Sequence, residues 1–291
     1  KRITENKLEI PQDHESILSG WADSINDSSI FRIKETALRS DFIHKILAGV
    51  LGYDTVSNKG VTYSLAEEYP LGFGSVDVAF GVFDKSDKAK DKVLAPFELK
   101  GAKTKDLDAI MPGRNKSPVQ QAWEYGMDAK GAKWVLVTNY TELRLYAIGY
   151  GRKSYESFDF AKLSDPVHYT RFVTLLSKDN LLSGQTFNLL KESEQVDKDI
   201  TKDLYDDYKA LRARLIKTIR EDNPAKDPLD VIRYTQTILD RILFIAFAED
   251  KKLLPDNTLQ KAYETKNPYN PQPVWENFKG LFHAINKGNK E

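Results

Sequence analysis

The order of strand-like and helix-like segments between residues 61 and 150 most constrains the fold of this chain. Three segments with the pattern of β-strands come first, over residues 61–70, 74–83 and 93–100. A helix is predicted next, over residues 116–131, and its end signals are Ser117, Pro118 and Gly131. Two more strand-like segments follow, over residues 133–140 and 142–150. This order predicts an α/β sheet flanked by helices, in which three strands meander and the next is joined across a helix.

Helical patterns lie on both sides of this region. Helices are predicted over residues 11–27 and 34–54, each with apolar residues at helical spacing. After about residue 185 a polar linker leads into a long amphipathic helix, whose apolar side carries Leu204, Tyr208, Leu211, Leu215 and Ile219. A more buried helix over residues 228–254 and a helical piece over 274–285 follow. We therefore expect an α/β domain over residues 1–190 and an all-α domain over 191–291.

Composition excludes several classes of protein. Lysine plus arginine and aspartate plus glutamate number 43 each, so net charge alone indicates neither a nucleic acid nor an acidic partner. The absence of cysteine rules out disulfides and thiolate metal sites and fits a reducing cytoplasm. No apolar run is long enough to span a membrane. The four histidines lack the spacing of zinc ligands. The chain begins at Lys1 without a methionine, so we expect a fragment of a longer protein.

A candidate site lies where the third strand ends, in the segment Glu98-Leu99-Lys100. Residues i and i+2 of a strand project from one face, so the carboxylate and the ammonium group stand side by side. Neighbouring strands can bring Asp77 close to them. Two carboxylates that share a Mg²⁺ ion, together with one lysine, suit phosphodiester hydrolysis. The alternative is an exposed ion pair that contributes little to stability.

Residues outside these strands can contribute to the same site. Glu35 lies two helical turns before Phe42, so it shares the inward stripe and needs a cation partner; favourable placement in the first helical turn is the alternative. Gln121 and Tyr125 are spaced i, i+4 on one helix face that can look towards the metal site or a DNA backbone. A loop beside the site carries four cations that can neutralise phosphates or form a solvated surface, namely Lys103, Lys105, Arg114 and Lys116.

The set Asp77, Glu98-Leu99-Lys100 and Gln121-x-x-x-Tyr125 resembles the PD-(D/E)xK nuclease superfamily, in the subgroup with a Q-x-x-x-Y helix. That fold is a mixed sheet flanked by helices. The segments 235–259 and 275–288, and especially 239–250, resemble the helical connector of type IIG restriction–modification enzymes. In those single chains a nuclease, a connector, an adenine methyltransferase and a target-recognition domain follow in order. The resemblance covers nearly the whole chain.

The resemblance implies a Mg²⁺-dependent endonuclease acting on double-stranded DNA, with Mn²⁺ as a substitute for Mg²⁺. Asp77, Glu98 and the Leu99 carbonyl would bind the metal, and Lys100 would be the catalytic lysine. Glu35 would be a supporting carboxylate and Gln121 would position the site. Val76 departs from the family's usual proline.

The methyltransferase and target-recognition domains would lie downstream, and S-adenosylmethionine would bind only there. No glycine-rich loop for that cofactor is present, and residues 267–271 are interpreted as a loop. Three other hypotheses stay open: the nuclease part of an ATP-driven type I restriction subunit, a degenerate nuclease fold that binds DNA, and an α/β protein-interaction domain.

Overall fold

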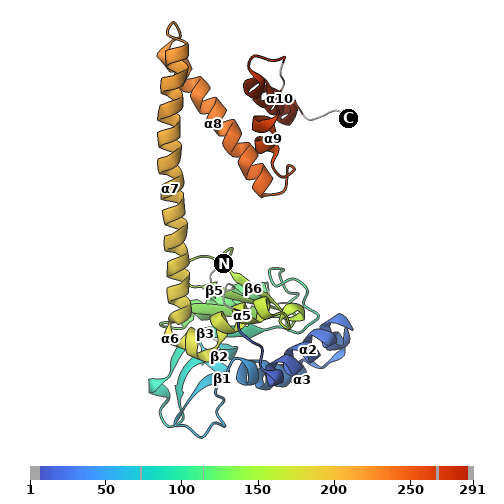
Figure 1. Cartoon of the computed structure of the whole chain (residues 1–291). Coiled ribbons are helices and arrows are strands. Elements are labelled where there is room, and N and C mark those ends of the chain that lie inside the picture. Colours follow the sequence, from blue (N-terminus) through green and yellow to red (C-terminus); the bar gives the residue numbers. More distant parts are fainter. Residues whose placement is uncertain (1–6, 73, 114, 267–268, 288–291) are drawn as a thin grey trace. The chain divides into compact units, whose positions relative to one another are not determined.

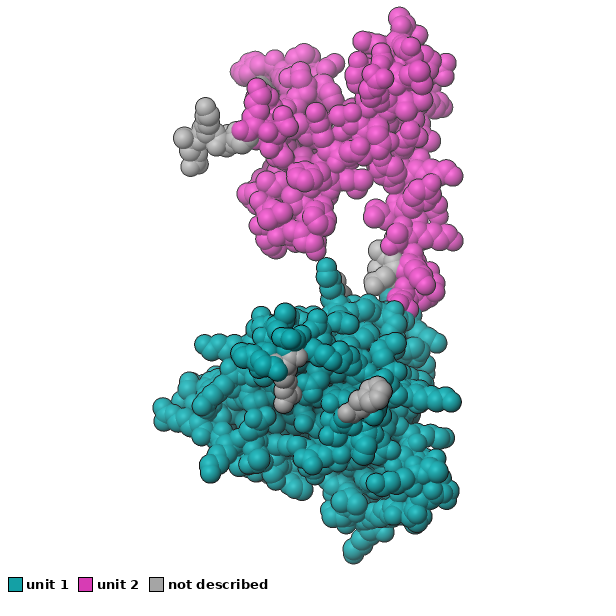
Figure 2. Space-filling model, turned by 180° about the vertical axis from the view of Figure 1, so that it is seen from behind, with its two compact units in different colours: residues 1–193 teal, residues 194–291 magenta. Residues whose placement is uncertain are grey.

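The computed structural model describes residues 7–72, 74–113, 115–266 and 269–287. The chain divides into two compact units, residues 1–193 and residues 194–291 (Figure 2). The sequence prediction placed the boundary between residues 190 and 191. No helix in the described ranges is long and apolar enough to cross a bilayer.

A six-stranded mixed sheet forms the centre of the first unit (Figure 1). Its strands lie in sequence order and are β1 (Thr62–Leu71), β2 (Gly74–Asp84), β3 (Lys92–Leu99), β4 (Trp134–Thr138), β5 (Glu142–Ala147) and β6 (Glu156–Asp159). Strands β3 and β4 are parallel, and every other neighbouring pair is antiparallel. A parallel pair needs a crossover connection. The chain makes this crossover through helix α4 (Pro118–Asp128), so the α/β class and the flanking helices agree with the prediction.

Helices cover both faces of this sheet. The larger core cluster joins the buried residues of β3, such as Phe97 and Leu99, to helices before and after the sheet. These are α2 (Gln12–Asn26), the π-helix η2 (Phe42–Val50), α5 (Pro166–Leu176) and α6 (Lys178–Ser183). Helix α3 (Glu35–Asp41) precedes η2, and short 3-10 turns span Ser29–Arg32, Lys88–Lys90 and Phe160–Lys162. On the opposite face, α4 packs Val119 and Trp123 against Val135 and Val137 of β4.

Helix α4 begins where the sequence predicts and ends earlier. The side-chain oxygen of Ser117 accepts a hydrogen bond from the Gln120 N–H, and the Gln120 side chain accepts one from the Ser117 N–H. This capping box fixes the first turn. The helix ends at Asp128, three residues before Gly131, the predicted end.

The second unit is helical, as expected, but one detail of the prediction is wrong. Helix α7 (Gln185–Asp222) is continuous, so the predicted polar linker is helical. Helix α8 (Pro228–Asp250) is more buried than α7, as expected, with Leu239 and Ile245 among its buried residues, although Phe244 and Phe247 are each 58% exposed. Helices α9 (Thr258–Glu264) and α10 (Pro273–Lys287) complete this unit. The sequence predicts a loop at residues 267–271, and residues 267 and 268 of it lie outside the described residues.

Candidate active site

Strands β2 and β3 place Asp77 and Glu98 opposite each other. Their antiparallel register pairs Val78 with Phe97, and one further step along the same register sets Asp77 against Glu98. Directly opposed residues of an antiparallel pair have Cβ atoms about 4.5–5.5 Å apart. Oδ2 of Asp77 accepts a hydrogen bond of 2.8 Å from the Leu99 N–H, which ties the two strand ends together. Two residues separated by a hairpin are therefore brought into one site.

Glu98 and Lys100 form a buried ion pair. Glu98 is 1% exposed and Lys100 is 7% exposed, and the Lys100 ammonium group donates a hydrogen bond to Oε1 of Glu98. The alternation of β3 explains why they meet: Phe97 and Leu99 point into the larger core, so Glu98 and Lys100 share the other face. The alternative interpretation as an exposed surface pair is therefore wrong.

The ion pair with Lys100 uses only one of the two carboxylate oxygens of Glu98. Oε2 is buried and makes no hydrogen bond within the described part of the chain. A buried carboxylate oxygen without a donor is costly and rare in folded proteins. Burial and, after it, the negative charge of Asp77 raise the pKa of Glu98 to about 7, against the opposing effect of Lys100. This carboxylate has both the unused lone pairs and the perturbed pKa that are typical of functional sites.

Two residues that the sequence analysis did not select belong to the same cluster. Arg39 on α3 donates from Nη2 to the main-chain carbonyl of Asp77 at 2.8 Å, and its Nη1 lies 3.9 Å from Oδ1 of Asp77. Tyr140, just after β4, is fully buried, and its hydroxyl makes no hydrogen bond in the described ranges. Burial, followed by the charges of Glu35 and Asp77, raises the pKa of Tyr140. No sequence pattern marks Arg39, because its contact with Asp77 crosses from a helix to a strand 38 residues away.

Glu35 lies near the site, although not as the helical stripe predicted. It is exposed rather than directed into the core. A Cβ atom placed on Gly101 would lie 3.4 Å from Oε2 of Glu35, so the carboxylate is adjacent to the end of β3. The reason for the difference is that Glu35 is the first residue of α3, where the stripe has not yet reached the core.

The helix residues Gln121 and Tyr125 lie on α4, which packs beside β3 and β4. Gln121 is half-buried. Tyr125 packs against the cluster that contains Val76, and a Cβ atom on Gly74 would come within 3.0 Å of its hydroxyl. The absence of a side chain at Gly74 therefore gives Tyr125 its place beside β2.

The predicted phosphate-binding cations lie on the connection between β3 and α4. Lys103 and Lys105 are exposed, and no ion pair of either is present in the described ranges. Lys116 forms an ion pair of 2.6 Å with Glu124 on α4. Arg114 lies outside the described residues. All three described cations are thus exposed, and Lys103 and Lys105 follow Lys100 of the buried pair within five residues of sequence.

The donor set fits a hard divalent cation, although no group of three or more histidine, aspartate or glutamate residues in the described ranges could hold a metal. Mg²⁺ needs only one or two carboxylates, since water and substrate phosphates complete its coordination. Asp77 and Glu98 provide these carboxylates, and Oε2 of Glu98 is an unused ligand atom. The N–H of Leu99 points towards β2, and the carbonyl of a strand residue points to the same side, so the Leu99 carbonyl can join them.

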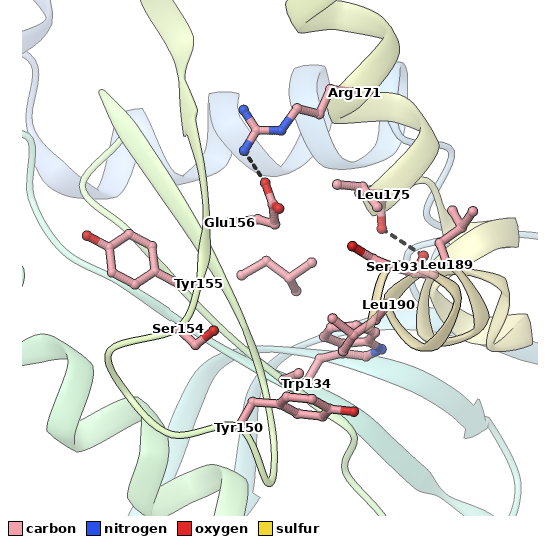
Figure 3. A pocket seen from close by; sticks show the side chains of 13 residues that line it. Trp134, Tyr150, Ser154, Tyr155, Glu156, Arg171, Leu175, Leu189, Leu190 and Ser193 are labelled. Carbon is pink, nitrogen blue, oxygen red and sulfur yellow. Dashed lines mark hydrogen bonds and ion pairs between the residues drawn. The ribbon is translucent and has the colours of Figure 1, made fainter. Parts of the chain in front are cut away.

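A separate cavity lies at the other end of β4 and uses none of these residues (Figure 3). Its volume is about 290 Å³, and its wall is largely apolar, with Trp134 and Leu190 among the lining side chains. Arg171 and Glu156 form an ion pair at this cavity. Because Glu156 already neutralises Arg171, the cavity offers no free charge to a ligand.

Comparison with protein-family models, with curated proteins and with solved structures finds no match for this chain. The fold and the site define an α/β protein with a buried carboxylate–lysine pair and an opposed aspartate at one end of its sheet.

Proposed function

We propose that this chain is a Mg²⁺-dependent endonuclease domain of the PD-(D/E)xK type with its helical connector, and that its substrate is double-stranded DNA. One observation carries the proposal: Glu98 is buried against Lys100 and opposite Asp77, and its Oε2 makes no hydrogen bond to any residue that the structure describes. A buried ion pair is weak support for stability, because desolvation offsets much of the attraction. Its placement at the end of a sheet, beside exposed lysines, is better explained by a task in binding and hydrolysis.

Each residue has a physical role in this proposal. Asp77 and Glu98 would hold the cation, with the Leu99 carbonyl as a third ligand. When bound, Mg²⁺ polarises the phosphate and lowers the pKa of a bound water molecule. Lys100 is fixed by Glu98 and can offset the negative charge that develops on the phosphate. The exposed Lys103 and Lys105 can contact the DNA backbone.

The roles of the helix residues follow from their positions. Gln121 on α4 would help to position the site. Glu35 next to Gly101 would be a supporting carboxylate at the edge of the cation site. Water would attack the phosphorus atom, the bond to the 3′ oxygen would break, and the product would carry a 5′-phosphate.

The helical second unit supports one parent architecture. Its sequence resembles the connector of type IIG enzymes, so we propose that a methyltransferase and a target-recognition domain follow in the same polypeptide. In the type I alternative, a helicase would follow instead. A degenerate nuclease fold that only binds DNA would keep the sheet and lose the affinity for divalent cations.

A Mn²⁺ soak of crystals of the chain tests the proposal. We expect anomalous difference density beside Asp77, Glu98 and the Leu99 carbonyl, and no density in an Asp77→Ala crystal. The matched control is Asp41→Ala, because Asp41 is an exposed aspartate whose ion pair with Lys45 lies outside the site. Density that is absent from the wild-type crystal, both free and bound to duplex DNA, would overturn the nuclease proposal in favour of the degenerate module.

A further inference from the structure

The guanidinium group of Arg39 joins helix α3 to strands β1 and β2 beside the site. Its Nη2 donates to the Asp77 carbonyl at 2.8 Å, and its Nη1 donates to Oε1 of Glu68 at 3.3 Å. The same Nη1 is 3.9 Å from Oδ1 of Asp77. The side chain of Arg39 is 20% exposed and that of Glu68 is 75% exposed, so solvent screens the contact with Glu68 much more than the part-buried contact with the Asp77 carbonyl. One side chain of α3 therefore holds both β1 and β2.

The partner of this contact on β1 is a strained residue. The register pairs Glu67 with Val78 and Tyr69 with Val76, which sets Glu68 opposite Asp77. Glu68 has a φ angle of +47°, in the left-handed region that a non-glycine residue seldom adopts. Such strain persists only where the surrounding structure enforces it. Arg39 contacts the side chain of this residue, which lies across the strand pair from a proposed metal ligand.

Electrostatics alone argues against a cation at this place. A positive charge near a carboxylate that binds a divalent cation repels that cation. Arginine has a compensating property, since its planar guanidinium carries several donors in a fixed geometry. Two hydrogen bonds from one rigid group fix the backbone of Asp77 relative to Glu68. The presence of Arg39 is therefore explained by geometry rather than by charge.

We infer that Arg39 is a positioning residue that sets the main chain and the carboxylate of Asp77 against Glu98. This inference rests on the proposed function, because it gives Asp77 the role of a metal ligand. Arg39 binds no cation itself. Its effect reaches the cation through Asp77, whose Oδ2 is fixed at the same time by the Leu99 N–H.

A metal-free measurement tests the positioning. The Leu99 amide resonance in an NMR spectrum of the whole chain reports on the bond between its N–H and Oδ2 of Asp77. We expect this resonance to shift in Arg39→Gln and to stay in place in Lys45→Gln. Lys45 is the matched control, since it is a nearby cation whose partner is the exposed Asp41. A Leu99 resonance that is the same in Arg39→Gln and in the wild type would overturn the inference, whatever the metal affinity.

A Mn²⁺ titration followed by electron paramagnetic resonance tests whether Arg39 affects cation binding, and it distinguishes an effect of geometry from an effect of charge. Loss of a group that orients a metal ligand weakens binding roughly tenfold to a hundredfold. We therefore expect weaker Mn²⁺ binding in Arg39→Gln, and in Arg39→Lys, which keeps the charge and loses the second donor. If Arg39 acted only through its charge, Arg39→Gln would bind Mn²⁺ more tightly and Arg39→Lys would match the wild type. That result would overturn the inference.

The titration also distinguishes this inference from the proposed function. A wild-type chain that binds Mn²⁺ in a way that Asp77→Ala abolishes supports the metal site, and unchanged affinity in Arg39→Gln then overturns the role of Arg39 alone. A wild-type chain that binds no Mn²⁺, with or without duplex DNA, overturns the metal site and the metal-linked role of Arg39 together.

Discussion

Asp77 and Leu99 are joined by a hydrogen bond of 2.8 Å from the Leu99 N–H to Oδ2 of the Asp77 side chain. This bond takes one carboxylate oxygen and directs the other towards Arg39, at 3.9 Å. It also places the negative charge of Asp77 beside Glu98, which helps to raise the pKa of the Glu98 carboxyl. The two carboxylates are therefore coupled without any ligand present.

The coupling predicts the effect of removing one charge. Asp77→Asn keeps the shape of the side chain and an oxygen that can accept from Leu99, but it removes the charge that raises the pKa of Glu98. We expect the pKa of Glu98 to fall below its wild-type value of about 7. Titration of the glutamate side-chain carbon signals by NMR measures it. Asp41→Asn is the control and leaves that pKa in place; an unchanged value in Asp77→Asn would contradict the coupling.

Lys100→Met tests what the buried pair contributes to stability. It leaves the Glu98 charge buried without a partner, and breaking a buried pair in this way costs about 3–5 kcal/mol. Burial raises the pKa of Glu98 from 4.5 to about 7, so the stability that this group contributes is complete below pH 4.5 and is lost as the pH rises through 7. Lys100 lowers the pKa of Glu98. Removing Lys100 therefore raises this pKa further, and the decrease in stability then continues to a higher pH.

We therefore expect Lys100→Met to be much less stable than the wild type at pH 8 and close to it at pH 5. Urea unfolding at the two pH values measures the difference. The double variant Glu98→Leu with Lys100→Met removes both charges, and we expect it to recover most of the stability at pH 8. An equal loss in the single variant at both pH values would show that the cost is one of packing rather than of charge.

Tyr140→Phe is expected to leave the unfolding free energy unchanged or to raise it. The Tyr140 hydroxyl is buried and makes no hydrogen bond in the described ranges, so its removal breaks no contact. Tyr53→Phe is the matched control, because the hydroxyl of Tyr53 is also buried and donates to the Leu176 carbonyl at 2.9 Å. Its loss leaves a buried acceptor unpaired, at a cost of about 1–3 kcal/mol. Thermal unfolding of both variants checks the contrast, and an equal loss in both would contradict it.

Local signals explain which parts of the fold could be predicted. The first five strands and α4 follow from alternation and from the capping box of Ser117, which act over a few residues. Strand β6 is only four residues long, Glu156–Asp159, and nothing in its own pattern distinguishes it from a loop. The exposure of Phe244 and Phe247 on α8 could not be predicted, because composition does not tell which apolar residues find a partner.

The candidate site also has some contacts that the sequence predicts and others that only the folded chain shows. The two-residue period of a strand predicted that Glu98 and Lys100 meet, but their burial depends on how distant parts of the domain pack around the end of β3. The contact of Arg39 with Asp77 spans 38 residues of sequence and crosses from a helix to a strand. No periodicity reaches that far, so only the folded chain brings the arginine to the site. Tyr140 was missed for the same reason.

The pH dependence of cation binding joins the structure to the proposed chemistry. A carboxylate must lose its proton before it binds a metal ion, so protons compete with the cation below the pKa of the ligand. Because the pKa of Glu98 is raised to about 7, the apparent affinity for Mn²⁺ should fall as the pH drops below 7 and level off above it. The fall approaches tenfold per pH unit if one proton is displaced. Ordinary carboxylates, with pKa values near 4, would give no change between pH 5.5 and 8. Titrations at pH 5.5, 6.5 and 8 separate the two cases: an affinity that falls towards acid pH supports a ligand carboxylate with a raised pKa, and a constant affinity would contradict it.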